Sequence, residues 1–98
     1  MGHHQSMDNK TLVITIQIRL EKADAEMAAQ NWKEANKLLK QALVELGDRY
    51  VRSDTIDDSG MKLIDADILE EEGKIDRAAR VRRRILAERL EMLKSKTP

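Results

Sequence analysis

The sequence predicts an all-α fold, and three observations support this prediction. Its 98 residues include four Gly and one Pro, the last residue Pro98, so little in the chain interrupts a long helix. The apolar residues are mainly Ala, Leu, Ile and Met, with Trp32 and Tyr50 as the only aromatic side chains. The chain also matches itself at an offset of 43 residues without a gap. A repeat of this length is typical of stacked helical units.

The repeat relates small and apolar positions in the two halves of the chain. Its matched pairs are Leu20 and Leu63, Ala23 and Ala66, Asp24 and Asp67, Ala35 and Ala78, and Leu38 and Val81. Side chains as small as Ala allow two helices to cross closely. We therefore expect each half to form an antiparallel helix hairpin in which the repeated alanines face each other.

The first segment, residues 11–20, is compatible with a strand or a helix. Its apolar residues alternate with polar ones as in a half-buried strand, and β-branched residues are dense. A stripe with helical spacing is also present, and it comprises Val13, Ile16, Leu20, Ala23 and Met27. A helix is favoured because the sequence contains no second strand-like segment for pairing. Asp8 or Asn9 would cap this helix.

A second helix is expected to begin near Trp32, and Gly47 can end it. Its apolar face would comprise Ala35, Leu38, Leu39, Ala42, Leu43 and Leu46. A polar segment then leads to the third helix. The start of that helix stays open, because Ser53, Thr55 and Ser59 are all candidate N-caps.

The third and fourth helices are expected to form the second hairpin, with Gly73 as the C-cap of the third. The third helix would bury Met61, Ile64, Ile68 and Leu69. The fourth helix, from about Asp76 to Lys94, would bury Ile75, Ala78, Ala79, Ile85, Leu86, Leu90 and Leu93. Arg82 differs from this pattern, since its counterpart in the first half is the apolar Leu39.

These elements predict one small domain. Residues 1–7 resemble an expression-tag remnant followed by a start Met, so His3 and His4 are set aside in the functional reasoning. The expected organisation is a first hairpin at 8–47, a connecting segment at 48–59, a second hairpin at 60–94 and a tail at 95–98.

The two units resemble tetratricopeptide repeats. In that family a helix with a small residue leads into a turn of the form Gly-Asp-Tyr-x-x-Ala. The turns here read Gln30-Asn31-Trp32-Lys33-Glu34-Ala35 and Gly73-Lys74-Ile75-Asp76-Arg77-Ala78. The small residue corresponds to Ala23 and Ala66, and the large residue and Ala of the second helix correspond to Leu39 and Ala42. The family's early aromatic residue is replaced by Arg19 and Lys62.

The resemblance implies stacked hairpins in which the first helix of each pair lines a concave, ligand-binding face. A period of 43 residues is about nine longer than the family's period. The extra residues would form a longer second helix or a loop at 47–59. A four-helix bundle is the alternative architecture.

Composition argues against an enzyme. The chain has no Cys and, beyond the first seven residues, no His, so nucleophilic dyads and most transition-metal sites lack their residues. The acidic pairs Asp57-Asp58 and Asp65-x-Asp67 have neither the calcium-loop spacing nor a dimetal arrangement. We expect no catalytic residues, no metal and no cofactor. Without a long apolar run or a secretory signal, we expect a cytoplasmic protein that does not enter a membrane.

Charge is unevenly distributed, although the net charge is zero. Residues 54–72 carry eight acidic side chains and one Lys, whereas residues 74–96 carry nine basic and three acidic ones. Adjacent helices of opposite charge can neutralise each other through surface ion pairs. A basic contact surface is the other candidate, and it would comprise Arg80, Arg83 and Arg84. Nucleic-acid binding is disfavoured, because these arginines point around the helix axis and no aromatic platform accompanies them.

The candidate partner-binding site comprises Leu20, Asp24, Met27, Leu63, Asp67 and Glu70. In each unit the three residues have the i, i+4, i+7 spacing of one helical stripe. An apolar strip edged by carboxylates suits a basic or amphipathic helix or peptide. The alternative is that the Leu and Met side chains are core residues, which spacing alone does not decide.

The leading functional hypothesis is a small non-enzymatic adaptor that holds a peptide or helix of a partner protein. About three repeats are needed to bury a continuous core, so two units leave an apolar face uncovered. The second hypothesis is therefore a self-associating helical subunit, a homodimer without a peptide groove. The third is a nucleic-acid accessory protein that uses its Arg-rich last helix.

Overall fold

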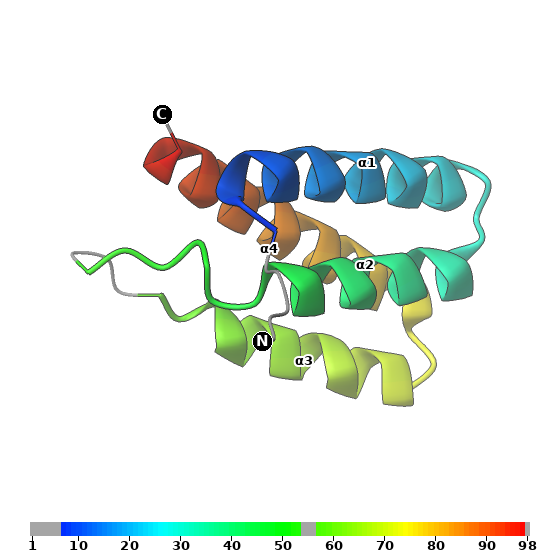
Figure 1. Ribbon diagram of the computed structural model, residues 1–98. Helices are drawn as coiled ribbons and strands as arrows, with labels where there is room; N and C mark the ends of the chain where they lie inside the picture. The colour runs from blue at the N-terminus through cyan, green and yellow to red at the C-terminus, as the bar shows by residue number, and fades with distance from the viewer. Residues whose placement is uncertain (1–6, 54–56, 98) are drawn as a thin grey trace, which may run out of the picture.

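The computed structural model describes residues 7–53 and 57–97, and its regular elements there are all helical. The four helices are α1 (Asn9–Ala28), α2 (Trp32–Leu46), α3 (Ser59–Glu71) and α4 (Ile75–Lys96) (Figure 1). The predicted all-α fold of two helix hairpins is confirmed. Residues 1–6 of the predicted tag, and Thr55 as a candidate N-cap, lie outside the described residues. No described helix is long and apolar enough to cross a lipid bilayer.

The prediction of a helix at 11–20 is confirmed by α1. Asp8 caps it, since its carboxylate accepts a hydrogen bond from the Thr11 amide at 2.8 Å. This hydrogen bond lowers the pKa of Asp8. The buried face comprises Leu12, Ile16, Leu20 and Ala23. The strand-like alternation therefore reflects outward-facing isoleucines, Ile14 and Ile18, on a helix.

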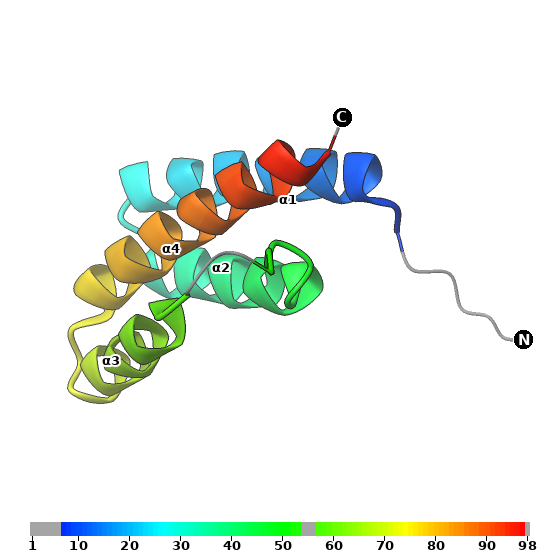
Figure 2. The ribbon, with the colours of Figure 1, turned by 90° about the vertical axis from the view of Figure 1, so that its left-hand side faces the viewer.

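Helix α4 is the central helix of the fold. Within the hairpins α1 packs on α2 and α3 packs on α4, while α1 and α2 both pack on α4 between the hairpins. Among the described helices, α3 has a close backbone approach to α4 alone. Figure 2 shows this arrangement, with α3 beneath α4 at one edge of the molecule. The first helices of the two hairpins, α1 and α3, therefore do not form a common face.

The core is aliphatic and lies between α1, α2 and α4. The repeated alanines are all fully buried, as expected for two closely crossing hairpins. Ala23 and Ala35 belong to the main cluster, and its other buried residues are Leu12, Ile16, Leu20, Leu39, Ala42, Leu46, Tyr50, Ala79, Leu86, Leu90 and Leu93. Helix α3 contributes none of these residues, so it lies at the periphery of the core.

The expected buried face of α3 is wrong. Met61, Ile64 and Ile68 are 69%, 55% and 47% exposed, and Leu69 is half-buried. The opposite side of the helix, centred on the fully buried Ala66, faces α4 instead. On that side α3 carries Ser59, Leu63, Ala66 and Glu70, and of these only Leu63 is a large apolar residue. These residues fit α4 because α4 presents arginine side chains to them.

Candidate protein-interaction surfaces

Arg82 is a buried arginine that joins α4 to α2 and α3. Its side chain is 2% exposed, and Nη1 donates to Oδ1 of Asn36 at 2.7 Å and to Oε1 of Glu70 at 2.5 Å. Nη2 donates to Oδ1 of Asp67 at 2.6 Å. Partial burial alone would raise the pKa of Glu70. The hydrogen bonds from Arg82 and Lys40 have the larger effect, so the net shift of the pKa is downward. The expected neutralisation of acidic α3 by basic α4 is therefore present at Arg82.

The candidate basic surface on α4 is divided among several contacts. Arg83 binds Asp24 of α1 through Nε at 2.9 Å and Nη2 at 3.0 Å, and this hydrogen bonding raises the pKa of Arg83. Arg80 lies over the Trp32 ring at 5.1 Å from its centroid. Arg84 is exposed and has no ion-pair partner among the described residues. The three arginines therefore do not present one free basic surface.

Arg89 anchors the connecting segment to α4. Its guanidinium donates to the Ser59 hydroxyl at 2.9 and 2.6 Å and lies 4.7 Å from the centroid of the Tyr50 ring. The Tyr50 hydroxyl donates to the Asp57 carboxylate, which also accepts from the Ser59 amide at 3.0 Å. Burial and this hydrogen bond raise the pKa of Tyr50. Burial alone would raise the pKa of Asp57, but the hydrogen bonds to its carboxylate have the larger effect and lower the pKa.

The two halves of the predicted partner-binding site lie on different sides of α4. In the first half Leu20 is a core residue, Met27 packs against the core, and Asp24 is bound to Arg83. In the second half Leu63 is half-buried, and both Asp67 and Glu70 are bound to Arg82. The structure thus brings each half close to α4 but does not unite them. A binding role for these six residues stays a prediction.

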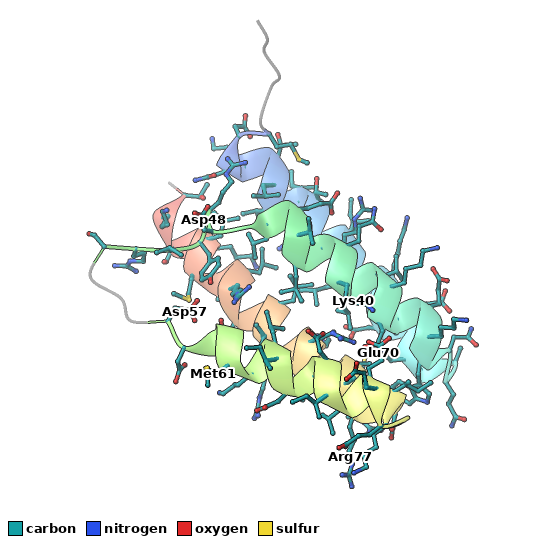
Figure 3. The ribbon with its side chains drawn as sticks, turned by 90° about the horizontal axis from the view of Figure 1, so that it is seen from below. Lys40, Asp48, Asp57, Met61, Glu70 and Arg77 are labelled. Atoms are coloured by element: carbon teal, nitrogen blue, oxygen red, sulfur yellow. The ribbon has the colours of Figure 1, made fainter. Side chains whose placement is uncertain are left out.

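An exposed apolar row on α3 consists of residues that the sequence pattern predicts to be buried. Met61, Ile64 and Ile68 follow one another at i, i+3 and i+7, and we call them the outer stripe of α3. Asp65 and Glu71, beside this row, are exposed and have no ion-pair partner among the described residues. Figure 3 looks onto this side of the molecule, with Met61 near the start of α3. The combination is an apolar strip with free carboxylates along it.

A row of opposite charge follows α2. Lys37, Lys40 and Val44 also have i, i+3, i+7 spacing, and we call them the basic stripe of α2. Val44 is 81% exposed. Lys40 approaches Glu70 of α3 with 3.3 Å between Nζ and Oε1, whereas Lys37 has no partner among the described residues. Figure 3 shows α2 and α3 side by side, with Lys40 and Glu70 between them.

A shallow hollow lies where the turns of the two hairpins meet. It has a volume of about 790 Å³, and its lining includes Trp32, Lys33 and Ile75. Among residues 7–53 and 57–97 no group of acidic or histidine side chains is arranged to hold a metal ion. Asp57 is engaged by Tyr50 and Ser59 instead.

No family model, curated protein or solved structure matches this chain. The functional assignment therefore depends on the surfaces of the molecule itself. One signal in the sequence could have revealed the orientation of α3: Arg82 replaces an apolar residue of the first unit. A buried arginine requires acidic or amide partners, so Asp67 and Glu70 had to face α4. The aliphatic residues of α3 then had to face outward.

Proposed function

We propose that this chain is a small non-enzymatic adaptor that binds a basic amphipathic helix of a partner protein on the outer stripe of α3. The exposure of Met61, Ile64 and Ile68 in one helical row carries the proposal. Single exposed apolar side chains are ordinary, but an aligned row of large ones is the form in which helices dock. The resemblance to tetratricopeptide repeats, which bind peptides and helices, is consistent with this role.

The charge around the outer stripe selects the partner. Asp65, Glu71 and Glu72 are exposed beside it, and Lys62 is the only basic residue of α3. A partner helix with Lys or Arg flanking its apolar face would pair with these carboxylates at the rim of the contact. Such rim charges contribute more to association rate and partner choice than to affinity. An acidic helix would be repelled.

The nucleic-acid role is less well supported than the adaptor role. Arg80, Arg82, Arg83 and Arg89 are each engaged with other parts of the chain. A phosphate would have to displace those contacts before it could bind. A cytoplasmic location and the absence of catalysis remain expectations from the sequence.

A synthetic basic amphipathic helix of Leu and Lys, labelled with a fluorophore, tests the proposal by fluorescence anisotropy. The key variant carries Ile64→Lys with Ile68→Lys. Its matched control carries Ile14→Lys with Ile18→Lys on α1, where the isoleucines have the same spacing and are 57% and 45% exposed. Circular dichroism verifies that both variants keep the helix content of the parent.

The proposal expects the α3 variant to bind the probe at least about tenfold more weakly than the parent. The α1 control should bind like the parent. Equal binding by all three proteins, or equal loss in both variants, would show that the outer stripe is not the docking surface.

A further inference from the structure

We infer that one occupant of the outer stripe is a second copy of this chain. In the inferred dimer the outer stripe of α3 packs on the basic stripe of α2 of the other copy. The inference rests on the proposed function in one respect, since it uses the same docking surface. It adds the identity of a partner, its orientation and its register.

Both stripes are exposed and face away from α4, on which α2 and α3 each pack. Helices α2 and α3 are side by side (Figure 3), and Lys40 reaches Glu70 across the space between them. The two helices run in opposite directions (Figure 1). The two helices thus present two exposed rows away from α4, one with lysines and Val44, the other with carboxylates and three large aliphatic residues.

Charge decides how two such pairs of rows can meet. With a two-fold axis parallel to the helices, packing α3 on α3 of the second copy would bring acidic rims together, with Glu71 and Glu72 near their own equivalents. Packing α2 on α2 would bring Lys37 and Lys40 near theirs. Packing α3 on α2 pairs carboxylates with ammonium groups in both halves of the contact. Like charges at an interface are strongly unfavourable, so the crossed arrangement is selected.

The crossed arrangement is compatible with a closed dimer. A two-fold axis that runs parallel to the helices, within the interface and opposite the space between α2 and α3, places each α2 over the α3 of the other copy. The same pair of stripes then meets twice, so the contact is isologous and leaves no copy of it open. A head-to-tail contact would instead leave one stripe free at each end and continue into a chain of copies.

The contact between Lys40 and Glu70 also sets the register of the apolar parts. Because α2 and α3 are antiparallel, a step forward from Lys40 along α2 is level with an equal step back from Glu70 along α3. Val44 is then level with the position midway between Ile64 and Ile68. The most exposed apolar residue of α2 therefore meets the gap between two exposed isoleucines.

The same register places the charges. Lys37 is level with Gly73, which directly follows Glu71 and Glu72. Lys37 of one copy therefore lies near these two carboxylates of the other copy. Apolar contact at the centre and opposite charges beside it are the composition of a specific interface.

Sedimentation equilibrium of the full chain, from about 1 µM to about 1 mM, measures the association. We expect a reversible monomer–dimer equilibrium. Val44→Lys should weaken it by at least about tenfold, while Ile14→Lys on α1 should leave it unchanged. A chain that stays monomeric throughout this range, or a dimer that Val44→Lys does not weaken, overturns the inference.

A charge exchange tests the crossed geometry. One variant carries Glu71→Lys with Glu72→Lys, and the other carries Lys37→Glu. Each variant alone should dimerise about tenfold more weakly than the parent, because like charges meet twice in its dimer. An equimolar mixture should recover the parental association, since each α2 then meets an α3 of opposite charge. A mixture that associates no better than the separate variants overturns the crossed geometry.

The two proposals fail independently. A monomeric chain that binds the basic Leu/Lys probe on α3 retains the adaptor function and loses the dimer. A dimer that passes the charge exchange, but whose dissociated monomers do not bind the probe, retains the dimer and loses the adaptor function. If both hold, the probe should shift the equilibrium toward monomer, because probe and second copy compete for the same stripe.

Discussion

The buried amide of Asn36 and the guanidinium of Arg82 connect the two hairpins. Nη1 of Arg82 donates to Oδ1 of Asn36 at 2.7 Å, and Nδ2 of Asn36 donates to the carbonyl oxygens of Trp32 and Ile75, each at 2.9 Å. Both hydrogens of the amide group are thus used, one within α2 and one toward the start of α4. A slip between the hairpins would leave these groups buried without partners, so they favour a single alignment.

Replacement of Arg82 should destabilise the fold. Arg82→Met keeps the length of the side chain but leaves Asn36, Asp67 and Glu70 without their shared donor. We expect the free energy of unfolding to fall by about 1–3 kcal/mol, since the buried oxygen of Asn36 loses its donor. Urea denaturation measures the loss. Arg84→Met, at an exposed arginine on the same helix, should change it by less than about 0.5 kcal/mol. Equal stability of the two variants would contradict the role of Arg82.

The coupling between Asn36 and Arg82 should appear in a double-mutant cycle. Asn36→Leu removes the acceptor of Arg82, and Arg82→Met removes the donor. The double variant should be more stable than the sum of the single losses predicts, by about 1–2 kcal/mol, because the interaction can be lost only once. Additive losses in urea denaturation would show that the two side chains stabilise the fold independently.

Acid should weaken the fold through carboxylates whose pKa values are lowered. The Arg19 guanidinium lowers the pKa of Glu45 below 4.5, and the pKa values of Glu70 and Asp57 are lowered from 4.5 and 3.8. Their contribution is fully present above the unfolded pKa values and is lost as the pH falls through the lower folded ones. Stability should therefore be constant from pH 7 to about pH 5 and fall below that.

Glu45→Gln provides the control for this pH dependence. Gln cannot titrate, so the variant should be less stable at neutral pH and lose less on acidification than the parent. Urea denaturation at neutral pH and near pH 3 gives both values. If the variant and the parent lose equal amounts between these pH values, the ion pair of Glu45 with Arg19 is not a source of acid sensitivity.

Asp24→Lys distinguishes the proposed docking surface from the six-residue site expected by resemblance. The Asp24 carboxylate is half exposed and bound to Arg83, so its loss should cost less than about 1 kcal/mol of stability. Because Asp24 lies on α1, far along the chain from the outer stripe of α3, the basic probe should bind the variant as it binds the parent. A marked loss in the anisotropy measurement would favour the six-residue site.

The sequence predicts α1, α2 and α4 well because each has one apolar face with helical spacing. For these helices periodicity alone identifies the side that is buried. Helix α3 is different, since its two opposite faces both contain apolar residues, Leu63 and Ala66 on one, Ile64 and Ile68 on the other. Its orientation depends on Arg82 and Arg89 of α4, which hydrogen bonding holds toward α3. Periodicity carries no information about that choice.

Spacing also could not predict whether the two halves of the candidate partner-binding site share one surface. Equal spacing places Asp24 and Asp67 at equivalent positions of their own helices. Whether they share a surface depends on how the hairpins pack, and here α4 lies between them, with Arg83 bound to one carboxylate and Arg82 to the other. Adjacent arginines of one helix point in different directions, so the two acids are drawn to different sides.

The backbone of α3 packs closely on α4 alone among the described helices, and this separates the proposed docking surface from the hydrophobic core. Core residues come from α1, α2, α4 and Tyr50, whereas the outer stripe belongs to α3. Substitutions along the outward side of residues 59–71 can therefore alter the proposed docking surface while the hydrophobic core stays intact. The chain is for this reason suited to selection of new binding specificities from a library confined to Met61, Ile64, Asp65 and Ile68, with Ala66 and the carboxylates that hold Arg82 left unchanged.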